Sequence, residues 1–479
     1  MSSIKEHNPL HIFFFPFLAH GHITPMVDLA NLFSSRGLKS TIITTPLNAS
    51  LIPQTPTSND VVLHVKTIDL PYGEAGLPYG CENLGRVAQH MIPKFLKATT
   101  LLGGPLERAM AESSPDWVVA DMMFFPWVAR SAAKLGIPTL AFHAVGFFPS
   151  CAHECMRSHR PYDDVSSDSE VFVIPGLPGE ISMTRIEVAD YVMRIEESEM
   201  LEILEESHEE ESNSNNNVES YGVVVNSFCE LEEDYVYYYR NVLGKKAWHI
   251  GPLSLYKANR GKEEEHECLK WLDTKKPNSV IYICFGTLST IPESQLSEIS
   301  MALEASNQQF IWVVKESKKE EEEEKEKWVL SGFEKRTQGK GLIIRGWAPQ
   351  VQILEHEAVG AFVTHCGWNS ILEAVSAGVP MITWPEYAEQ FYNEKLLTQV
   401  LRIGVPVGVK KWTRFQRDDI KWDAIEKLVK RIMEGEEAEG MRNRAKVLAH
   451  KARVAVQKDG SSYSDFNALI QELAMCCHH

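Results

Sequence analysis

The sequence predicts an α/β protein made of two doubly wound domains, each built on a parallel β-sheet. The chain has 479 residues, which is too long for one compact core. Short apolar runs alternate with helical segments in both halves, as in proteins with parallel sheets. Residues 251–267 are charged, contain glycine and show little periodicity, which is typical of a linker. We therefore expect a first domain over residues 1–250 and a second over residues 268–457.

The first half begins with a strand followed by a helix. Residues 11–17 form a continuous apolar run, as in parallel strands buried on both faces. In the helix that follows, Thr24 is a good N-cap, Pro25 a good first residue and Gly37 a good end. Apolar residues at spacings of three and four support this helix: Ile23, Met26, Val27, Ala30 and Phe33. Further strands are predicted over residues 40–44, 117–120, 139–142 and 222–225.

The second half restarts the same alternation of strands and helices. A helix is predicted over residues 293–304. Strands are predicted over residues 280–285, 310–314, 342–344 and 361–364. Directly after the last strand, Gly367 opens a segment with apolar residues at helical spacing. The first amides of such a helix lack partners and carry the positive end of its dipole, so this turn predicts a diphosphate site.

Polar residues around this turn fit the other parts of a nucleotide sugar. His365 ends the strand, and Asn369 and Ser370 supply short donors for the diphosphate. Glu373 lies one turn beyond Asn369 on the same helix face, where its carboxylate can accept from both ribose hydroxyls. Trp347, upstream, offers a flat face on which a base can stack. The Ala348 backbone and the Gln350 amide are candidate partners for the polar edge of the base. Glu389 and Gln390 are candidate partners for the sugar hydroxyls.

Each of these residues alone also fits an ordinary role, such as a core tryptophan or a solvated glutamate. Together, the segment over residues 347–390 resembles the signature of plant family 1 UDP-dependent glycosyltransferases: W-A-P-Q, then H-C-G-W-N-S, then an acidic residue and Gln. The resemblance implies the GT-B fold, with two Rossmann-like domains facing across a cleft. It also implies that the last helix, within residues 458–479, packs back on the first domain.

The resemblance assigns a role to each residue of this segment. It implies that Trp347 stacks on uracil and that Glu373 binds the ribose. Trp368, together with a final Gln390, is what the family shows when glucose is the donor sugar. The remaining implied contacts are Ala348 and Gln350 to uracil, His365, Gly367, Asn369 and Ser370 to the diphosphate, and Glu389 and Gln390 to the sugar.

Transfer of a sugar to a hydroxyl needs a general base, and the turn after the first strand contains two histidines. His22 lies beside the predicted helix start, and we expect this position to favour the neutral imidazole. The resemblance selects His22 over His20, because the family base occupies the first position of an H-x-x-P pattern. Asp121 ends the strand over residues 117–120 within ADMMFFPW, which resembles the family segment that holds the partner aspartate. The alternative role for Asp121 is to cap the following helix.

These residues predict a single displacement that inverts the anomeric carbon and needs no covalent intermediate. We expect no cofactor and no metal, because the chain contains no D-x-D sequence and helix amides with His365 can neutralise phosphate charge. Thr287 follows the strand over residues 280–285 and is expected to contact a phosphate, at a position where the family often has Ser.

The resemblance also extends to the acceptor. ADMMFFPW, IPGLPG and ITTPLNA are similar to segments of glucosyltransferases that act on flavonoids and triterpenoids. This predicts transfer of glucose from UDP-glucose to a hydroxyl of a small hydrophobic plant metabolite, giving a β-glucoside. Another sugar, transfer to a carbon atom, and a nucleotide-sugar-binding relative without turnover remain open. Six residues can line an apolar acceptor pocket or form core: Leu77, Tyr79, Phe124, Phe147, Phe148 and Tyr191.

Composition excludes several other classes of protein. A net charge of -17 without a basic stripe disfavours nucleic acid as a partner. Nine cysteines without a C-x-x-C pair favour a reducing compartment, so we expect a cytoplasmic protein. We also expect a monomer. The apolar run near the N-terminus is broken by Pro16, and no stretch approaches the length of a membrane span. We assign no function to the charged runs over residues 207–217 and 316–327, nor a metal site to the terminal CCHH.

Overall fold

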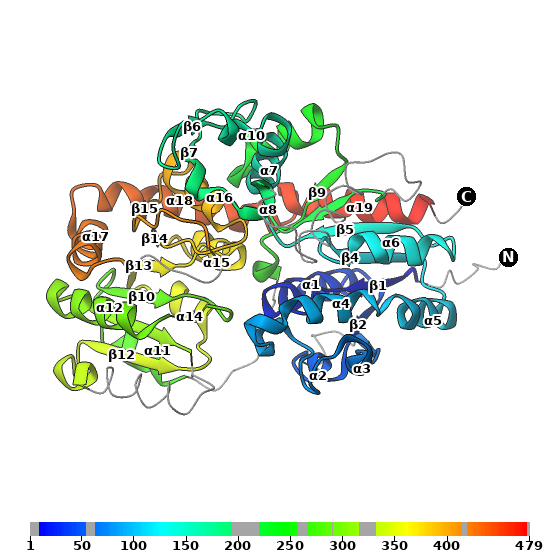
Figure 1. The fold of residues 1–479 in the computed structure, drawn as a ribbon, viewed down its shortest axis with the longest axis horizontal. Coiled ribbons are helices and arrows are strands. Elements are labelled where there is room, and N and C mark those ends of the chain that lie inside the picture. The colour runs from blue at the N-terminus through cyan, green and yellow to red at the C-terminus, as the bar shows by residue number, and fades with distance from the viewer. Residues whose placement is uncertain are drawn as a thin grey trace.

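Two parallel β-sheets organise the chain, as predicted (Figure 1). The computed structural model describes residues 9–53, 63–193, 220–256, 266–289, 291–315, 332–413 and 419–476. The charged runs over residues 207–217 and 316–327, and much of the predicted linker, lie outside these ranges. The end of the terminal CCHH also lies outside them, and its first residue, Cys476, is exposed.

The first sheet has seven strands in the order β3-β2-β1-β4-β5-β8-β9, and each neighbouring pair is parallel. Its strands are β1 (His11–Phe15), β2 (Lys39–Thr44), β3 (His64–Thr67), β4 (Trp117–Asp121), β5 (Thr139–His143), β8 (Val223–Val225) and β9 (Ala247–His249). All residues of β1, β4 and β5 are buried, because helices cover both faces of this sheet. β1 is two residues shorter than the apolar run that predicts it, since Pro16 cannot donate to a neighbouring strand.

Helices connect the strands of the first sheet. The longer ones are α1 (His20–Ser34), α4 (Ile92–Thr100), α5 (Gly103–Ser113), α6 (Phe125–Ala133) and α7 (Phe147–His159). Four short ones are α2 (Pro46–Ala49), α3 (Tyr72–Ala75), α8 (Asp190–Met193) and α10 (Glu233–Tyr237). Between α7 and α8, an antiparallel hairpin is formed by β6 (Val171–Val173) and β7 (Ser182–Thr184). This hairpin is separate from the seven-stranded sheet.

The second sheet has six parallel strands in the order β12-β11-β10-β13-β14-β15. Its strands are β10 (Val280–Cys284), β11 (Gln309–Val314), β12 (Gly341–Arg345), β13 (Val359–Thr364), β14 (Met381–Thr383) and β15 (Gly404–Pro406). Its helices are α11 (Glu267–Asp273), α12 (Glu293–Ser306), α14 (Gln350–Glu355), α15 (Trp368–Ala377), α16 (Gln390–Lys395), α17 (Trp422–Glu434) and α18 (Ala438–Val456). The two Rossmann-like sheets of the predicted fold class are therefore both present.

The last helix, α19 (Ser461–Cys476), lies on the first domain, beside β9 and α1 (Figure 1). Its apolar side chains Phe466, Leu469 and Leu473 are fully buried in a core shared with β1 and α1. Phe466 meets Phe33 of α1 edge-on, with ring centroids 5.0 Å apart. A second core cluster contains buried residues of both domains, so apolar packing is continuous between them.

Candidate active site

The predicted site residues lie where each sheet reverses its strand order. In the first sheet, β1 and β4 are neighbours, but the chain continues from β1 to β2 on one side and from β4 to β5 on the other. In the second sheet, β10 continues to β11 on one side and β13 to β14 on the other. Ligands of doubly wound sheets bind at the carboxyl ends of such strand pairs. His22 follows β1 and Asp121 is the last residue of β4, while Thr287 follows β10 and Gly367 follows β13. Topology therefore brings both groups of residues to ligand-binding edges.

The structure joins His22 and Asp121 in one hydrogen bond. His22 Nδ1 lies 2.9 Å from Asp121 Oδ2, and the aspartate is fully buried while the imidazole side chain remains 26% exposed. The second carboxylate oxygen, Asp121 Oδ1, accepts the backbone amide of Met123 at 3.1 Å. Asp121 therefore holds both the histidine and the turn before α6, whose own N-cap is Phe124. Nε2 of His22 is left as the ring nitrogen that can face a substrate.

The electrostatic surroundings of His22 differ from the sequence-based expectation. Burial lowers the pKa of His22, but the charge of Asp121 and its hydrogen bond raise it, and Glu389 raises it further. The resulting pKa lies above the ordinary value, so the expectation that the helix terminus dominates was wrong in direction. A helix terminus acts as a partial charge, whereas Asp121 is a full charge in direct contact.

The start of α1 also differs from the prediction and explains a contact between the domains. The helix begins at His20, with Ala19 as N-cap, and Pro25 lies inside it. Because proline has no amide hydrogen, the carbonyl four residues earlier, that of Gly21, receives no helical hydrogen bond from it. This carbonyl instead accepts Asn369 Nδ2 at 2.6 Å. α15 of the second domain is thus bonded to the first turn of α1, directly beside His22.

The predicted diphosphate turn has the expected strand, turn and helix geometry. β13 ends at Thr364, Cys366 has a φ of 65°, and Gly367 is the N-cap of α15. The ring of His365 lies against two glycines, since a Cβ on Gly286 would be 2.7 Å from its Cε1 and one on Gly367 would overlap Nε2. The two glycines therefore leave room for the imidazole to approach both backbones, and Gly286 also has a φ of 79°, which favours glycine. Thr287 follows Gly286 and is exposed.

The residues predicted to bind uracil and ribose form one cluster. Gln350 Nε2 donates to Glu373 Oε2 at 2.7 Å and to Ser370 Oγ at 3.1 Å, while its Oε1 accepts the hydroxyl of Tyr282 at 3.2 Å. Trp347 precedes this cluster and is 68% exposed, as a stacking surface must be. Ala348 and the other members are at least half-buried. Sequence reasoning missed Tyr282, because a tyrosine inside an apolar strand reads as core.

Trp368 occupies a different place from the one its predicted sugar role suggests. Its side chain is buried and points into the first domain, where Nε1 donates to the Asn226 carbonyl at 2.7 Å. A Cβ on Gly146 would lie 2.5 Å from the indole and 2.6 Å from Glu232. The indole therefore fills a space between the domains, and no sequence signal linked Trp368 to Gly146 or Asn226.

Glu232, which sequence analysis did not single out, supports this contact. Its carboxylate accepts the backbone amides of Phe147 at 3.1 Å and Phe148 at 2.7 Å, and the hydroxyl of Ser227. Burial raises the pKa of Glu232 to about 7, against the opposing effect of these hydrogen bonds. The carboxylate holds the first turn of α7 beside Trp368.

The last two residues of the signature lie at the start of α16. Gln390 Oε1 accepts the backbone amides of Glu386 at 2.8 Å and Tyr387 at 3.2 Å, which leaves its amide nitrogen for a ligand. Burial raises the pKa of Glu389, and the charge of His22 opposes that rise. The charge of Glu389 in turn raises the pKa of His22, so the two charges influence one another across the domains.

The candidate acceptor residues divide into core and surface. Phe124, Phe147 and Phe148 are completely buried, and the last two pack edge-on against Tyr239 and Tyr235. These three phenylalanines therefore form core in this structure. Leu77 is also buried, whereas Tyr79 is 83% exposed and contacts Tyr72, and Tyr191 lies between His153 and Trp412.

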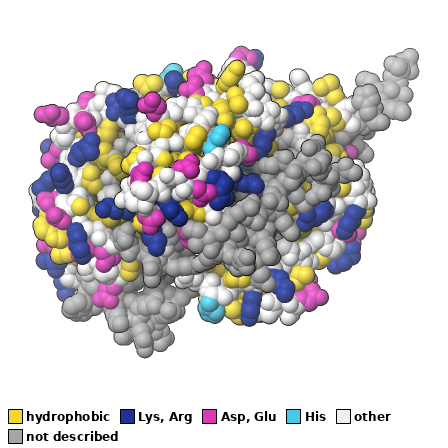
Figure 2. All heavy atoms as spheres, turned by 45° about the horizontal axis from the view of Figure 1, so that its top comes forward, with side chains coloured by type: hydrophobic (Ala, Val, Ile, Leu, Met, Phe, Trp, Pro, Cys, Tyr) yellow, Lys and Arg dark blue, Asp and Glu magenta, His cyan; other side chains and the backbone are white. Residues whose placement is uncertain are grey.

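Among the described residues, no three His, Cys, Asp or Glu side chains cluster as a metal ion would require. No described helix is long and apolar enough to cross a membrane. Figure 2 shows basic and acidic side chains interspersed over the described part of one face, without a broad patch of either sign.

Comparison with known proteins agrees with this geometry. Residues 100–430 match the family described as UDP-glucoronosyl and UDP-glucosyl transferase. A scopoletin glucosyltransferase of Nicotiana tabacum is 49% identical over 478 residues, covering 97% of this chain and 98% of that protein. UDP-glucose flavonoid 3-O-glucosyltransferase 7 of Fragaria ananassa is 52% identical over 488 residues, covering 98% and 97%.

A solved structure is similar over the same extent. The crystal structure of Glycyrrhiza uralensis UGT73P12, complexed with glycyrrhetinic acid 3-O-monoglucuronide, superposes with a TM-score of 0.87. The two sequences are 38% identical, and the similar region covers 98% of this chain and 96% of the Glycyrrhiza uralensis chain. Relatives and fold therefore agree along nearly the whole sequence, and the family match lies within it. The chain belongs to the UDP-glucoronosyl and UDP-glucosyl transferase family and is a UDP-glycosyltransferase.

Proposed function

We propose that this chain transfers glucose from UDP-glucose to a hydroxyl of a small hydrophobic plant metabolite, with inversion at the anomeric carbon. The observation that carries this proposal is the His22–Asp121 hydrogen bond, beside the bond from Asn369 to Gly21. It brings a base and its orienting carboxylate next to the segment expected to hold the donor sugar. The relatives named above as glucosyltransferases support glucose as the sugar.

In this mechanism, His22 is the general base and Asp121 orients it. Because Asp121 holds Nδ1, the Nε2 lone pair accepts the proton of the acceptor hydroxyl. The acceptor oxygen forms a bond to the anomeric carbon as the bond from that carbon to the diphosphate oxygen breaks. UDP leaves with the bonding electron pair, and Asp121 stabilises the imidazolium until the proton passes to solvent. Attack opposite the leaving group converts an α-linked donor into a β-glucoside.

The leaving diphosphate is assigned to the turn before α15. The helix amides after Gly367, with His365 and the Thr287 hydroxyl, supply donors to the charge that develops there. We propose that these groups suffice without a divalent cation. Glu373 is assigned to the ribose and Trp347 to the uracil face, with Gln350 and Ala348 at its edge.

The acceptor class follows from the relatives' own substrates. Their names include scopoletin, flavonoid and anthocyanin glucosyltransferases, and the similar solved structure holds a triterpenoid glucuronide. These compounds share a rigid ring system with an exposed hydroxyl. We propose an acceptor of this kind, bound on the first-domain side of His22.

The direct test is to incubate the purified chain with UDP-glucose and scopoletin, a flavonol or glycyrrhetinic acid 3-O-monoglucuronide. We expect a hexose mass gain on at least one acceptor, a β configuration by proton NMR, and unchanged turnover with EDTA. Binding of UDP-glucose without transfer to any acceptor would instead support a relative without turnover. A product that resists acid hydrolysis would indicate transfer to carbon.

We also propose that the protein acts as a cytoplasmic monomer. The described cysteines are all free thiols, which suits a reducing compartment. Light scattering of the purified chain tests the monomer, and imaging of a fluorescent fusion tests the location. A dimer at assay concentrations, or a signal confined to a secretory compartment, would contradict these proposals.

A further inference from the structure

The β6–β7 hairpin of the first domain lies over the second domain, against α16 and the π-helix Leu396–Val400 that continues it (Figure 1). Ser182 and Gln399 exchange two hydrogen bonds of 3.0 Å, one from the Ser182 amide to Oε1 and one from Nε2 to the Ser182 carbonyl. The Ile186 carbonyl also accepts the Trp412 amide at 3.0 Å. The segment from β7 onward is therefore bonded to the second domain at several points.

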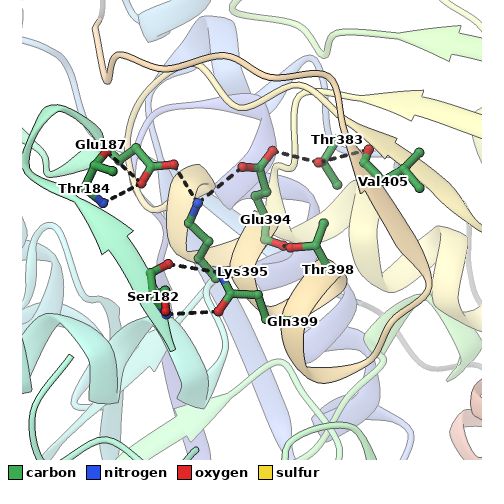
Figure 3. Close-up of polar contacts among 9 residues, drawn as sticks. All are labelled: Ser182, Thr184, Glu187, Thr383, Glu394, Lys395, Thr398, Gln399 and Val405. Atoms are coloured by element: carbon green, nitrogen blue, oxygen red, sulfur yellow. Dashed lines mark hydrogen bonds and ion pairs between the residues drawn. The ribbon is translucent and has the colours of Figure 1, made fainter. Parts of the chain in front are cut away.

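At the centre of this contact, one lysine lies between two carboxylates (Figure 3). Lys395 Nζ is 2.6 Å from Glu187 Oε1 and 3.7 Å from Glu394 Oε1. The other oxygen of Glu187 accepts the backbone amide and hydroxyl of Thr184, at 2.7 and 3.0 Å. The other oxygen of Glu394 accepts the Thr383 hydroxyl at 2.7 Å. Every carboxylate oxygen in this cluster therefore has a partner.

The cluster is almost sealed from water. The exposed fractions of the Lys395, Glu187 and Glu394 side chains are 10%, 11% and 4%. Burial raises the pKa of Glu394 to about 7, although the charge of Lys395 opposes that rise. Removing charges from water is costly, and an apolar replacement of a buried pair is often at least as stable. Such a pair is better explained by the register that it imposes between two surfaces than by stability.

The element held in register carries the end of the donor signature. α16 begins at Gln390, its N-cap is Glu389, and all six of its residues are buried. Asn393 Nδ2, on the same helix, donates to the Cys366 carbonyl at 2.9 Å and to Glu389 Oε1 at 3.2 Å. The last residue of α16 is Lys395. A shift of this lysine would therefore move the groups expected to bind the sugar.

We propose that Glu187, Lys395 and Glu394 form an interdomain joint that positions α16 for sugar transfer, so that Glu187 and Lys395 are positioning residues. The first domain thereby sets the place of a donor-sugar site whose side chains all belong to the second. This inference rests on the proposed function, because Glu389 and Gln390 are taken to bind the transferred sugar.

The test compares Glu187→Gln and Lys395→Met with a matched control, Lys430→Met. Lys430 forms an exposed pair with Glu426 at 2.6 Å in the same domain, so its loss removes a charge without loosening the joint. Glu187→Gln keeps an oxygen for Thr184 and is the gentler change. It stands in if Lys395→Met fails to fold. Thermal unfolding establishes that each variant is native at the assay temperature.

We expect Glu187→Gln and Lys395→Met to lower kcat about tenfold, since small displacements of a reacting group have effects of that order or more. Affinity for UDP-glucose should fall, whereas affinity for UDP, which lacks the sugar, should match wild type and Lys430→Met. The double variant should be no worse than the poorer single variant, because both break one interaction. Equal loss of UDP and UDP-glucose affinity, or wild-type kcat in Glu187→Gln, would overturn the joint.

Failure of the proposed function has a different signature. If wild type transfers no sugar to any acceptor, the proposed function fails, and the joint is then judged by binding alone. It still requires Glu187→Gln to bind UDP-glucose more weakly while UDP binding stays the same. Wild-type transfer together with an unaffected Glu187→Gln variant overturns only the joint.

Discussion

The carboxyl edges of the two sheets have the same topology and different chemistry. At β1 and β4, a histidine from the first helix is bonded to a buried aspartate at the strand end. At β10 and β13, two glycines make room for the His365 ring, and a helix opens with its amides toward the edge. The first edge can move a proton, and the second can hold an anion.

This difference teaches that strand order locates a site without deciding its chemistry. In the first sheet, β4 ends in Asp121, which fills the edge with a negative charge that would repel a phosphate. In the second, β13 ends in Thr364 and is followed by Gly367, which leaves the start of α15 open. Two edges of one kind can therefore take opposite parts in a single reaction.

The largest expected effect comes from removing the proposed base at the carboxyl edge of β1 and β4. His22→Ala removes the proposed base, so kcat should fall on the order of a hundredfold to ten-thousandfold. UDP affinity, measured by calorimetry, should be unchanged because the anion edge is intact. Transfer at the wild-type rate would remove His22 from this role.

The second effect tests the same edge through the pH dependence of the reaction. Asp121→Asn should lower kcat about a hundredfold, because the imidazolium loses its carboxylate. The charge and hydrogen bond of Asp121 raise the pKa of His22, so removing them lowers that pKa. A base works only when deprotonated, and the acidic limb of kcat/KM should therefore move to lower pH. An acidic limb that stays in place, or moves to higher pH, would contradict the assignment.

The third effect comes from narrowing the proposed diphosphate site at the carboxyl edge of β10 and β13. Gly367 has φ −65° and ψ 138°, which alanine tolerates, so Gly367→Ala acts only through the overlap of its Cβ with His365. UDP binding should weaken roughly tenfold, the cost of about one displaced charge-assisted hydrogen bond. Gly103→Ala is the control, because its Cβ would lie 3.6 Å from Ser131 Oγ and 3.9 Å from Trp127 Cε3, which are ordinary contacts. Equal UDP affinity in the two variants would count against the anion edge.

The smallest effect tests the bond between the edges. Pro25→Ala supplies an amide that competes with Asn369 for the Gly21 carbonyl. We expect kcat to fall about three- to tenfold, the value of one hydrogen bond, while thermal stability holds or rises because alanine favours helix. Pro93→Ala, in the first turn of α4, is the matched control, since its amide would lack an intrahelical partner. A wild-type kcat in Pro25→Ala would show that the freed carbonyl has no such role.

Much of the fold followed from local patterns. Continuous apolar runs predicted the central strands of both sheets to within two residues, because such strands are buried on both faces. The helix after Gly367 was predicted equally well, since a glycine turn precedes apolar residues at regular helical spacing. The start of α1 was misplaced because Pro25 was taken as a first helical residue, whereas it lies inside the helix.

By itself, the sequence determined the family, the two-domain α/β class and the identity of the candidate base, because these depend on residue types at short, regular spacing. Only the tertiary structure decided which hydrogen bonds join the two domains. These bonds run from the Trp368 indole to Asn226, from Asn369 to Gly21, and from Lys395 to Glu187. These partners lie far apart in the chain, and two of the acceptors are backbone carbonyls, which every residue carries. Residue spacing cannot mark a backbone group that becomes available only when the domains pack together.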